Sequence, residues 1–127
     1  MIKVKDLMNK VVYTEKDITV KEAAVIMSKM KIGSLVYIKD KKVVGILTER
    51  DVIKNISRIK KKISHIILKK PIKIDLNRKI EEAAKLMSHY KIKRLLVTEK
   101  DNLVGIITAT DIIANSDILN DSSFFVW

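Results

Sequence analysis

The sequence predicts an α/β (α+β) fold made of two β-α-β-β-α repeats, related by pseudo-twofold symmetry and packed through their sheets. Residues 17–57 align with residues 77–117 at a spacing of sixty without a gap, and 15 of these 41 positions are identical. Both copies show the same succession of helical and alternating apolar patterns. Neither copy is large enough to bury its own sheet well, so we expect the copies to pack together.

The first copy begins with an extended segment, residues 11–14, followed by a helix. Thr19 and Glu22 have the spacing of a capping box at its start. Two β-rich runs, 35–38 and 43–47, then flank a polar turn, and a second helix is predicted over 49–56. The apolar stripe expected on the first helix consists of Val20, Ala23, Ala24, Met27 and Met30.

The second copy predicts the same elements in the same order. Its extended segment is 71–74, its strands are 95–98 and 103–107 around a turn at 100–102, and its last helix is 109–115. Lys79 stands where the first copy has the capping Thr19, so Asn77 is an alternative cap. The corresponding helical stripe is Ile80, Ala83, Ala84, Met87 and Tyr90.

Composition limits the class of protein. The 127 residues carry a formal charge of +11, and 32% of them are charged, which argues against disorder and membrane insertion. The chain has no cysteine, and its amino terminus lacks the apolar region of a signal peptide, so we expect a cytoplasmic protein. The positive charge favours nucleotides or nucleic acid as partners, and a lysine-coated surface is an equally good explanation.

The chain is expected to divide into repeat 1 (1–57), a basic linker (58–62), repeat 2 (63–117) and an aromatic tail (118–127). The basic composition of the linker, Arg58 to Lys62, indicates a solvated connector or the end of a helix. The tail has no counterpart in the first copy and ends in Phe124-Phe125-Val126-Trp127. We expect such an aromatic tail to pack on its own domain or on a partner subunit, and a disordered tail is the alternative. Of these possibilities we favour self-association.

These motifs resemble a tandem pair of CBS (cystathionine-β-synthase) domains, a stand-alone Bateman module, over residues 1–117. The family's entering Met-x-x-Pro segment lacks its proline at Met8–Val12 and keeps it at Pro71, and the Glu-Ala-Ala helix occurs twice. Leu35-Val36-Tyr37 and Leu95-Leu96-Val97 lack the proline common in that strand. The signature Gly-x-x-Thr-x-x-Asp is intact twice, as Gly45–Asp51 and Gly105–Asp111.

The resemblance implies a regulatory module that binds AMP, ADP, ATP or S-adenosylmethionine in clefts between the repeats and requires no cofactor. It also implies a homodimer through helix faces and an unidentified regulated protein. The aspartates would bind the ribose diol, and the threonines would bind ribose or phosphate. Arg94 would bind phosphate, and the apolar residues would pack on adenine. The implied ligand residues are Val12, Ser34, Ile46, Thr48, Arg50 and Asp51, with Ile72, Arg94, Ile106, Thr108, Thr110 and Asp111.

In related pairs each cleft combines the two repeats. By that pattern Val12 would serve with Thr108 and Asp111, and Ile72 with Thr48 and Asp51. The copies differ at Arg50 and Thr110 and at Ser34 and Arg94, so we expect unequal affinities for the same nucleotide.

Other interpretations remain open. Thr-x-x-Asp before an apolar helix is also a cap, and a capped helix end can still present its carboxylate. Nucleic-acid binding through the lysine-rich surface is the alternative function, although no reading motif occurs. The sequence has no glycine-rich phosphate loop, no zinc-ligand spacing and no serine nucleophile with a positioned base, so we expect binding without catalysis and no metal.

Overall fold

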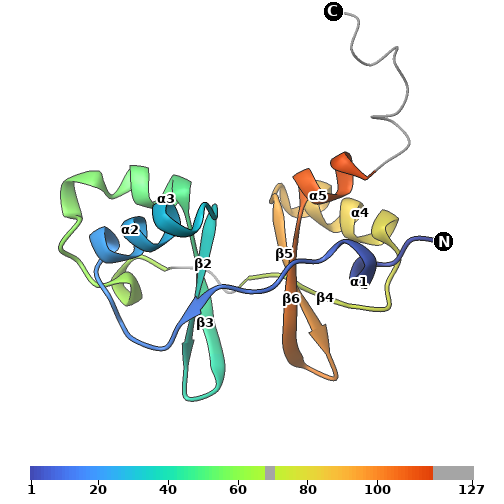
Figure 1. The fold of residues 1–127 in the computed structure, drawn as a ribbon, viewed down its shortest axis with the longest axis horizontal. Helices are drawn as coiled ribbons and strands as arrows, with labels where there is room; N and C mark the ends of the chain where they lie inside the picture. The colour runs from blue at the N-terminus through green and yellow to red at the C-terminus, as the bar shows by residue number, and fades with distance from the viewer. Residues whose placement is uncertain (68–70, 116–127) are drawn as a thin grey trace, which may run out of the picture. The chain divides into compact units, whose positions relative to one another are not determined.

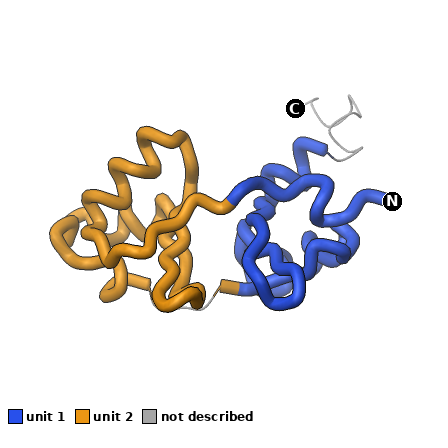
Figure 2. The backbone as a smooth tube through the Cα atoms, turned by 60° about the horizontal axis from the view of Figure 1, so that its bottom comes forward, with its two compact units in different colours: residues 1–10, 72–127 blue, residues 11–71 orange. Residues whose placement is uncertain are grey.

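The structure is a computed structural model that describes residues 1–67 and 71–115. The predicted aromatic tail, 118–127, therefore lies outside the described residues. The chain forms two compact units, shown in two colours in Figure 2. Unit 2 covers the described residues from Val11 to Pro71, and unit 1 combines Met1–Lys10 with the described residues from Ile72 onward.

Unit 2 is built around the first copy and contains a three-stranded sheet. The strand order is β1-β2-β3, with β1 parallel and β3 antiparallel to β2. Figure 1 shows α2 and α3 on the same face of this sheet. The elements of the unit are β1 (Tyr13–Thr14), α2 (Val20–Met30), β2 (Ser34–Lys39), β3 (Lys42–Thr48), α3 (Glu49–Lys54), and the 3-10 turns η1 (Ile56–Arg58) and η2 (Ile63–His65).

Unit 1 repeats this arrangement around the second copy. Its strand order is β4-β5-β6, again with one parallel and one antiparallel pair. The predicted strands and long helices are confirmed in both units, with ends that shift by one or two residues. The elements of the unit are α1 (Val4–Leu7), β4 (Lys73–Asp75), α4 (Ile80–Tyr90), β5 (Arg94–Glu99), β6 (Asn102–Thr108) and α5 (Ala109–Ala114).

The two long helices begin differently. The capping box predicted for α2 is confirmed, since Thr19 and Glu22 exchange hydrogen bonds at its start. These bonds from the backbone and hydroxyl of Thr19 lower the pKa of Glu22. Asn77 does not cap α4: the N-cap is Lys79, without a side-chain bond, and the Asn77 N–H donates to Asp75 instead.

The apolar stripes of α2 and α4 are narrower than predicted. Val20, Ala23 and Met27 are buried on α2, and their counterparts on α4 are buried as well. Met30 and Tyr90, which end the predicted stripes, are 54% and 49% exposed. Each is the last residue of its helix and lies directly before a C-cap residue in the left-handed conformation.

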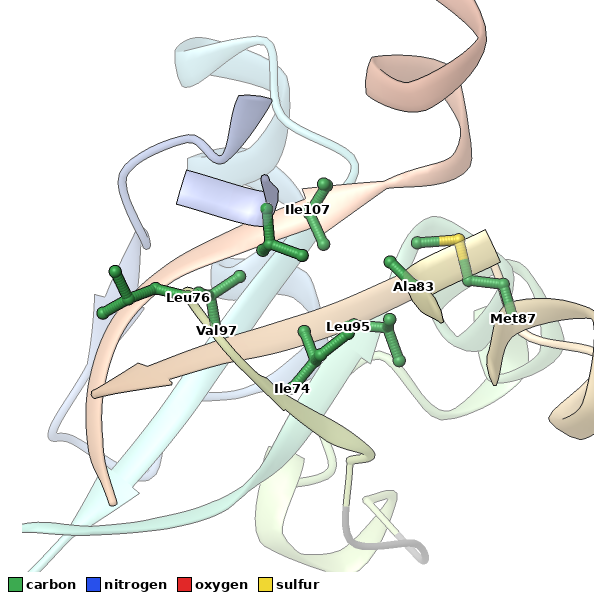
Figure 3. Close-up of a cluster of buried hydrophobic side chains, with 8 residues drawn as sticks. Ile74, Leu76, Ala83, Met87, Leu95, Val97 and Ile107 are labelled. Carbon is green, nitrogen blue, oxygen red and sulfur yellow. The ribbon is translucent and has the colours of Figure 1, made fainter. Parts of the chain in front are cut away.

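Each unit has its own apolar core, and each core contains a residue from a short helical segment that no periodicity predicted. Val4 of α1 belongs to the core of unit 1, whose other members are drawn in Figure 3. Ile63 of η2 has the same place in the core of unit 2. Both side chains are 0% exposed. The remaining buried members in unit 1 are Ile74, Leu76, Ala83, Met87, Leu95, Val97 and Ile107.

Main-chain bonds hold these two segments in place. In unit 1 the Val4 N–H donates to the Arg78 carbonyl at 2.8 Å. In unit 2 the Ile63 N–H donates to the Ile18 carbonyl at the same distance. Residues 1–10, which belong to repeat 1 by sequence, therefore complete the unit that contains repeat 2.

The basic segment 58–62 is docked on unit 2. Carbonyls of Ile59 and Lys61 accept hydrogen bonds from the first two N–H groups of α2, each at 2.9 Å. Four basic side chains of the segment remain exposed to solvent. The side chains are thus solvated, while the backbone of the segment completes the start of α2.

Asp17 provides a pH-dependent contact between the two ends of unit 2. Its carboxylate accepts hydrogen bonds from the backbone and hydroxyl of Ser64, forty-seven positions away. Burial raises the pKa of Asp17, but these bonds and the charges of Lys62 and His65 outweigh that effect, and the pKa is lowered.

We expect this contact to make unit 2 less stable in acid. Because the folded-state pKa is lowered, the stabilisation is present above the ordinary aspartate pKa and is lost as the pH falls through the folded-state value. Asp17→Asn should lower the free energy of unfolding by about 0.5–1 kcal/mol at pH 7, allowing for solvent screening, and by much less near pH 3. Urea unfolding at both pH values measures this. Ser64→Ala should behave alike, and an equal loss at both pH values would contradict the assignment.

Candidate functional site at the two strand-to-helix corners

Each copy of the signature forms a corner where the last strand of a sheet passes into a short helix. We name them the Asp51 corner, residues 48–51 between β3 and α3, and the Asp111 corner, residues 108–111 between β6 and α5. The first N–H of each helix donates to a backbone carbonyl just before the neighbouring strand. The Ala109 N–H thus bonds the Lys93 carbonyl at 2.8 Å, and the Glu49 N–H bonds the Gly33 carbonyl at 3.1 Å.

Both aspartates are turned onto the start of their own helix. Oδ2 of Asp51 accepts hydrogen bonds from the N–H and hydroxyl of Thr48, at 2.8 and 3.0 Å. Oδ2 of Asp111 accepts the corresponding bonds from Thr108, at 2.9 and 2.8 Å. Each threonine hydroxyl accepts from the aspartate N–H in return. The corners are complete capping boxes, so the capping interpretation of Thr-x-x-Asp is confirmed.

The cap uses only one oxygen of each carboxylate. Oδ1 of Asp51 and Oδ1 of Asp111 accept no hydrogen bond from any residue that the structure describes. Both side chains are half-buried. A carboxylate oxygen that is held in place and unoccupied can accept bonds from the hydroxyls of a ligand.

Two asparagines support the corners from the far end of the short helices. Nδ2 of Asn55 donates to the Asp51 carbonyl at 2.8 Å, and Nδ2 of Asn115 donates to the Asp111 carbonyl at 2.9 Å. No role was predicted for these two asparagines. Their identity in the two copies was the signal that could have identified them.

The residues beside the two corners give them different net charges. Ser34 pairs directly with Thr48 across the β2–β3 ladder, and Arg94 pairs with Thr108 across β5–β6. Arg94 forms no ion pair in the described part of the chain, where Arg78–Glu82 is the single salt bridge. With Lys93 beside it, the Asp111 corner is the more basic of the two.

The apolar residues of the predicted site follow the same ladders. The Val36 N–H donates to the Val12 carbonyl, and Val36 pairs with Ile46. The matching row in unit 1 runs from Ile72 through Leu96 to Ile106.

Each unit therefore brings together its own six predicted site residues at one end of its sheet. Arg50 and Thr110, the residues directly before the two aspartates, are exposed. The predicted clefts would combine Val12 with Asp111, and Ile72 with Asp51. The residues of each pair belong to different units, so this arrangement stays a prediction.

One residue at the Asp111 corner was not predicted. Nδ2 of Asn9 donates to Oδ2 of Asp111 at 2.9 Å, across 102 positions of sequence. Its main chain forms a pair of bonds with Ile106, at 2.8 and 2.9 Å. Gly105 permits this approach, because a Cβ there would lie 2.8 Å from Sδ of Met8 and 3.0 Å from the Asn9 carbonyl oxygen. The close approach explains the glycine of the second signature.

A shallow groove of about 540 Å³ lies on unit 1 between β4 and α4. Its lining includes Lys73, Arg78 and His89 and none of the predicted site residues. Across residues 1–67 and 71–115, no group of three or more His, Cys, Asp or Glu side chains could hold a metal ion. No helix in the same ranges is long and apolar enough to cross a membrane.

The chain belongs to the CBS domain family. The CBS domain model matches twice, at residues 4–58 and 63–117, which correspond to the two copies of the repeat. The resemblance inferred from the duplicated signature is thus confirmed, and so is the α/β class with one three-stranded sheet in each repeat. The packing of the repeats through their sheets stays a prediction.

Three similar proteins illustrate the relationship. The uncharacterized protein MJ1232 of Methanocaldococcus jannaschii is 33% identical over 88% of this chain, which spans 38% of that protein. The uncharacterized protein YlbB of Bacillus subtilis is 32% identical over 88% of this chain and 80% of its own length. The solved CBS domain pair of protein MJ0100, in complex with 5′-methylthioadenosine and S-adenosyl-L-methionine, has a TM-score of 0.82 at 31% identity and covers 90% of this chain and 94% of that one.

Proposed function

We propose that this CBS pair is a regulatory module that binds adenosine-containing ligands at its two corners and catalyses no reaction. The observation that carries the proposal is the repeated carboxylate with one oxygen held by the helix cap and the other unoccupied by described residues. The ribose diol of an adenosine compound supplies the hydroxyl donors for such an acceptor. The MJ0100 pair, which was solved with two adenosine compounds, supports this choice of ligand class.

The surroundings of the corners support different preferences within that class. Arg94 and Lys93 favour a phosphate-bearing ligand, such as AMP or ATP, at the Asp111 corner. At the Asp51 corner the corresponding residues are the uncharged Ser34 and Gly33. The charges of Arg50 and Glu49 there are opposite in sign. We therefore expect a nucleotide to bind the two corners with different affinities.

Self-association is part of the proposal. Ile53 on α3 is 70% exposed, and Met30, at the end of α2, is 54% exposed. These side chains could contribute apolar contacts to an interface formed by the helices. We propose a homodimer through such helix faces, in which a bound ligand changes how the second copy or a regulated protein docks.

Titration with a ligand series tests the function. We expect AMP, ATP or S-adenosylmethionine to raise the melting temperature and GMP, the base-specificity control, to have a smaller effect. A ligand at one hundred times its Kd adds about 2.7 kcal/mol to the free energy of unfolding. Calorimetry gives the number of sites, and sedimentation velocity with and without ligand gives the oligomeric state.

The same titration distinguishes adenosine binding from the alternative function, nucleic-acid binding. If no adenosine compound stabilises the protein, while RNA or DNA binds with an affinity that falls steeply with salt, the module is a nucleic-acid-binding protein. Two identical and independent sites in calorimetry would contradict the expected difference between the corners.

A further inference from the structure

The amino-terminal segment reaches the Asp111 corner with a fixed geometry. The main-chain N–H and carbonyl of Asn9 both bond to Ile106, two positions before Thr108. Figure 1 shows the segment crossing β6 before the corner. These two main-chain bonds place the backbone of Asn9 beside β6, from where its short, exposed side chain reaches Asp111.

The side chain of Asn9 gives Asp111 a third donor. The carboxylate of Asp111 can only accept hydrogen bonds, so the amide group must present its nitrogen. Oδ2 of Asp111 then accepts from Asn9 and twice from Thr108, all within 2.9 Å. Three donors in different directions hold the carboxylate in one orientation and leave Oδ1 as its free acceptor.

The Asp51 corner differs at this point. Oδ2 of Asp51 accepts only the two bonds from Thr48 among the described residues. At a spacing of sixty, the sequence places Lys69 opposite Asn9, and Lys69 lies outside the described residues. A lysine cannot supply a short, neutral amide donor.

We propose that Asn9 is a positioning residue of the Asp111 corner: its amide orients Asp111 so that Oδ1 meets the ribose diol of the ligand. This inference rests on the proposed adenosine-binding function and adds a residue that acts at one corner only. Asn9 works through Asp111: it adds a donor to the oxygen that the cap already holds, and so fixes the direction of the free oxygen. Among the described residues, no side chain makes the corresponding bond to Asp51.

Single-corner backgrounds isolate the effect. In Asp51→Ala protein only the Asp111 corner keeps its carboxylate, and there Asn9→Ala should weaken AMP binding about three- to tenfold in calorimetry. Asn9→Asp should weaken it more than tenfold, because it places a second negative charge beside Asp111. In Asp111→Ala protein, Asn9→Ala should leave AMP binding at the Asp51 corner unchanged. Lys10→Ala, an exposed neighbour, is the matched control and should change neither corner.

A ligand-free measurement keeps the inference separate from the proposed function. The side-chain amide protons of Asn9 should shift in NMR spectra of Asp111→Ala and remain unchanged in Asp51→Ala. A ligand role without positioning would appear, in the Asp51→Ala background, as AMP binding that Asp111→Ala abolishes and Asn9→Ala leaves intact; that result overturns the inference and keeps the function. Equal weakening of both corners by Asn9→Ala, with a lowered melting temperature, would show a purely structural role. Absence of AMP binding, together with unshifted Asn9 amides, overturns both.

Discussion

Val4→Asp is expected to unfold unit 1. The Val4 side chain is fully buried among the residues drawn in Figure 3, and a carboxylate there has no partner. Burying an unpaired charge costs several kcal/mol, which is comparable to the whole stability of a small domain. Chemical denaturation should show a loss of about 4 kcal/mol or more, and the NMR resonances of residues 72–115 should lose their dispersion.

Matched variants test the position and the mechanism. Lys5→Asp makes a charge change at the next residue, which is exposed, and should alter stability by no more than about 0.5 kcal/mol. Val4→Ala should cost about 1–2 kcal/mol through the cavity that it leaves. A folded Val4→Asp protein of normal stability would show that the amino-terminal segment is no part of the core.

Asp51→Ala and Asp111→Ala are expected to separate the two roles of the corners. Each change removes a cap, which costs about 1 kcal/mol of stability. Each also removes the acceptor proposed for the ribose hydroxyls, so affinity at that corner should fall about a hundredfold, equivalent to about 2.7 kcal/mol. Calorimetry with AMP and urea unfolding of the ligand-free protein measure the two effects separately.

Glu22→Ala is the control that the chain itself offers. The Thr19–Glu22 capping box has the same hydrogen bonds as the corners and starts α2 instead of following a last strand. This variant should lose stability through its missing cap and keep full affinity for AMP. If the two aspartate variants behaved in the same way, the carboxylates would serve as caps alone and ligand binding at the corners would be wrong.

The internal repeat made most of the fold predictable. Each element seen in one copy could be checked against the other, so the hairpins and helices around Gly45 and Gly105 were located from local patterns. The same comparison identified both Thr-x-x-Asp corners. It left open whether the aspartates cap or bind, because that depends on which oxygen is occupied, and the structure shows that the cap takes Oδ2.

The features that the sequence did not reveal depend on contacts between distant residues. Val4 and Ile63 lie in segments too short to show a period, and each is buried by residues that precede or follow it by many positions. Asn9 carried no signal, since the residue aligned with it is Lys69 and the comparison of copies favours shared residues. Its hydrogen bond to Asp111 spans 102 positions, a distance at which local patterns hold no information.

The placement of residues 1–10 sets an order for folding during synthesis. Unit 2 is one continuous stretch, so it can fold as soon as that stretch has left the ribosome. The segment made first must wait until β4, α4, β5 and β6 have been translated before Val4 finds its core. Residues 1–10 therefore join their unit only after the strands and the long helix of that unit have been made, and a bulky insertion next to them would slow this step.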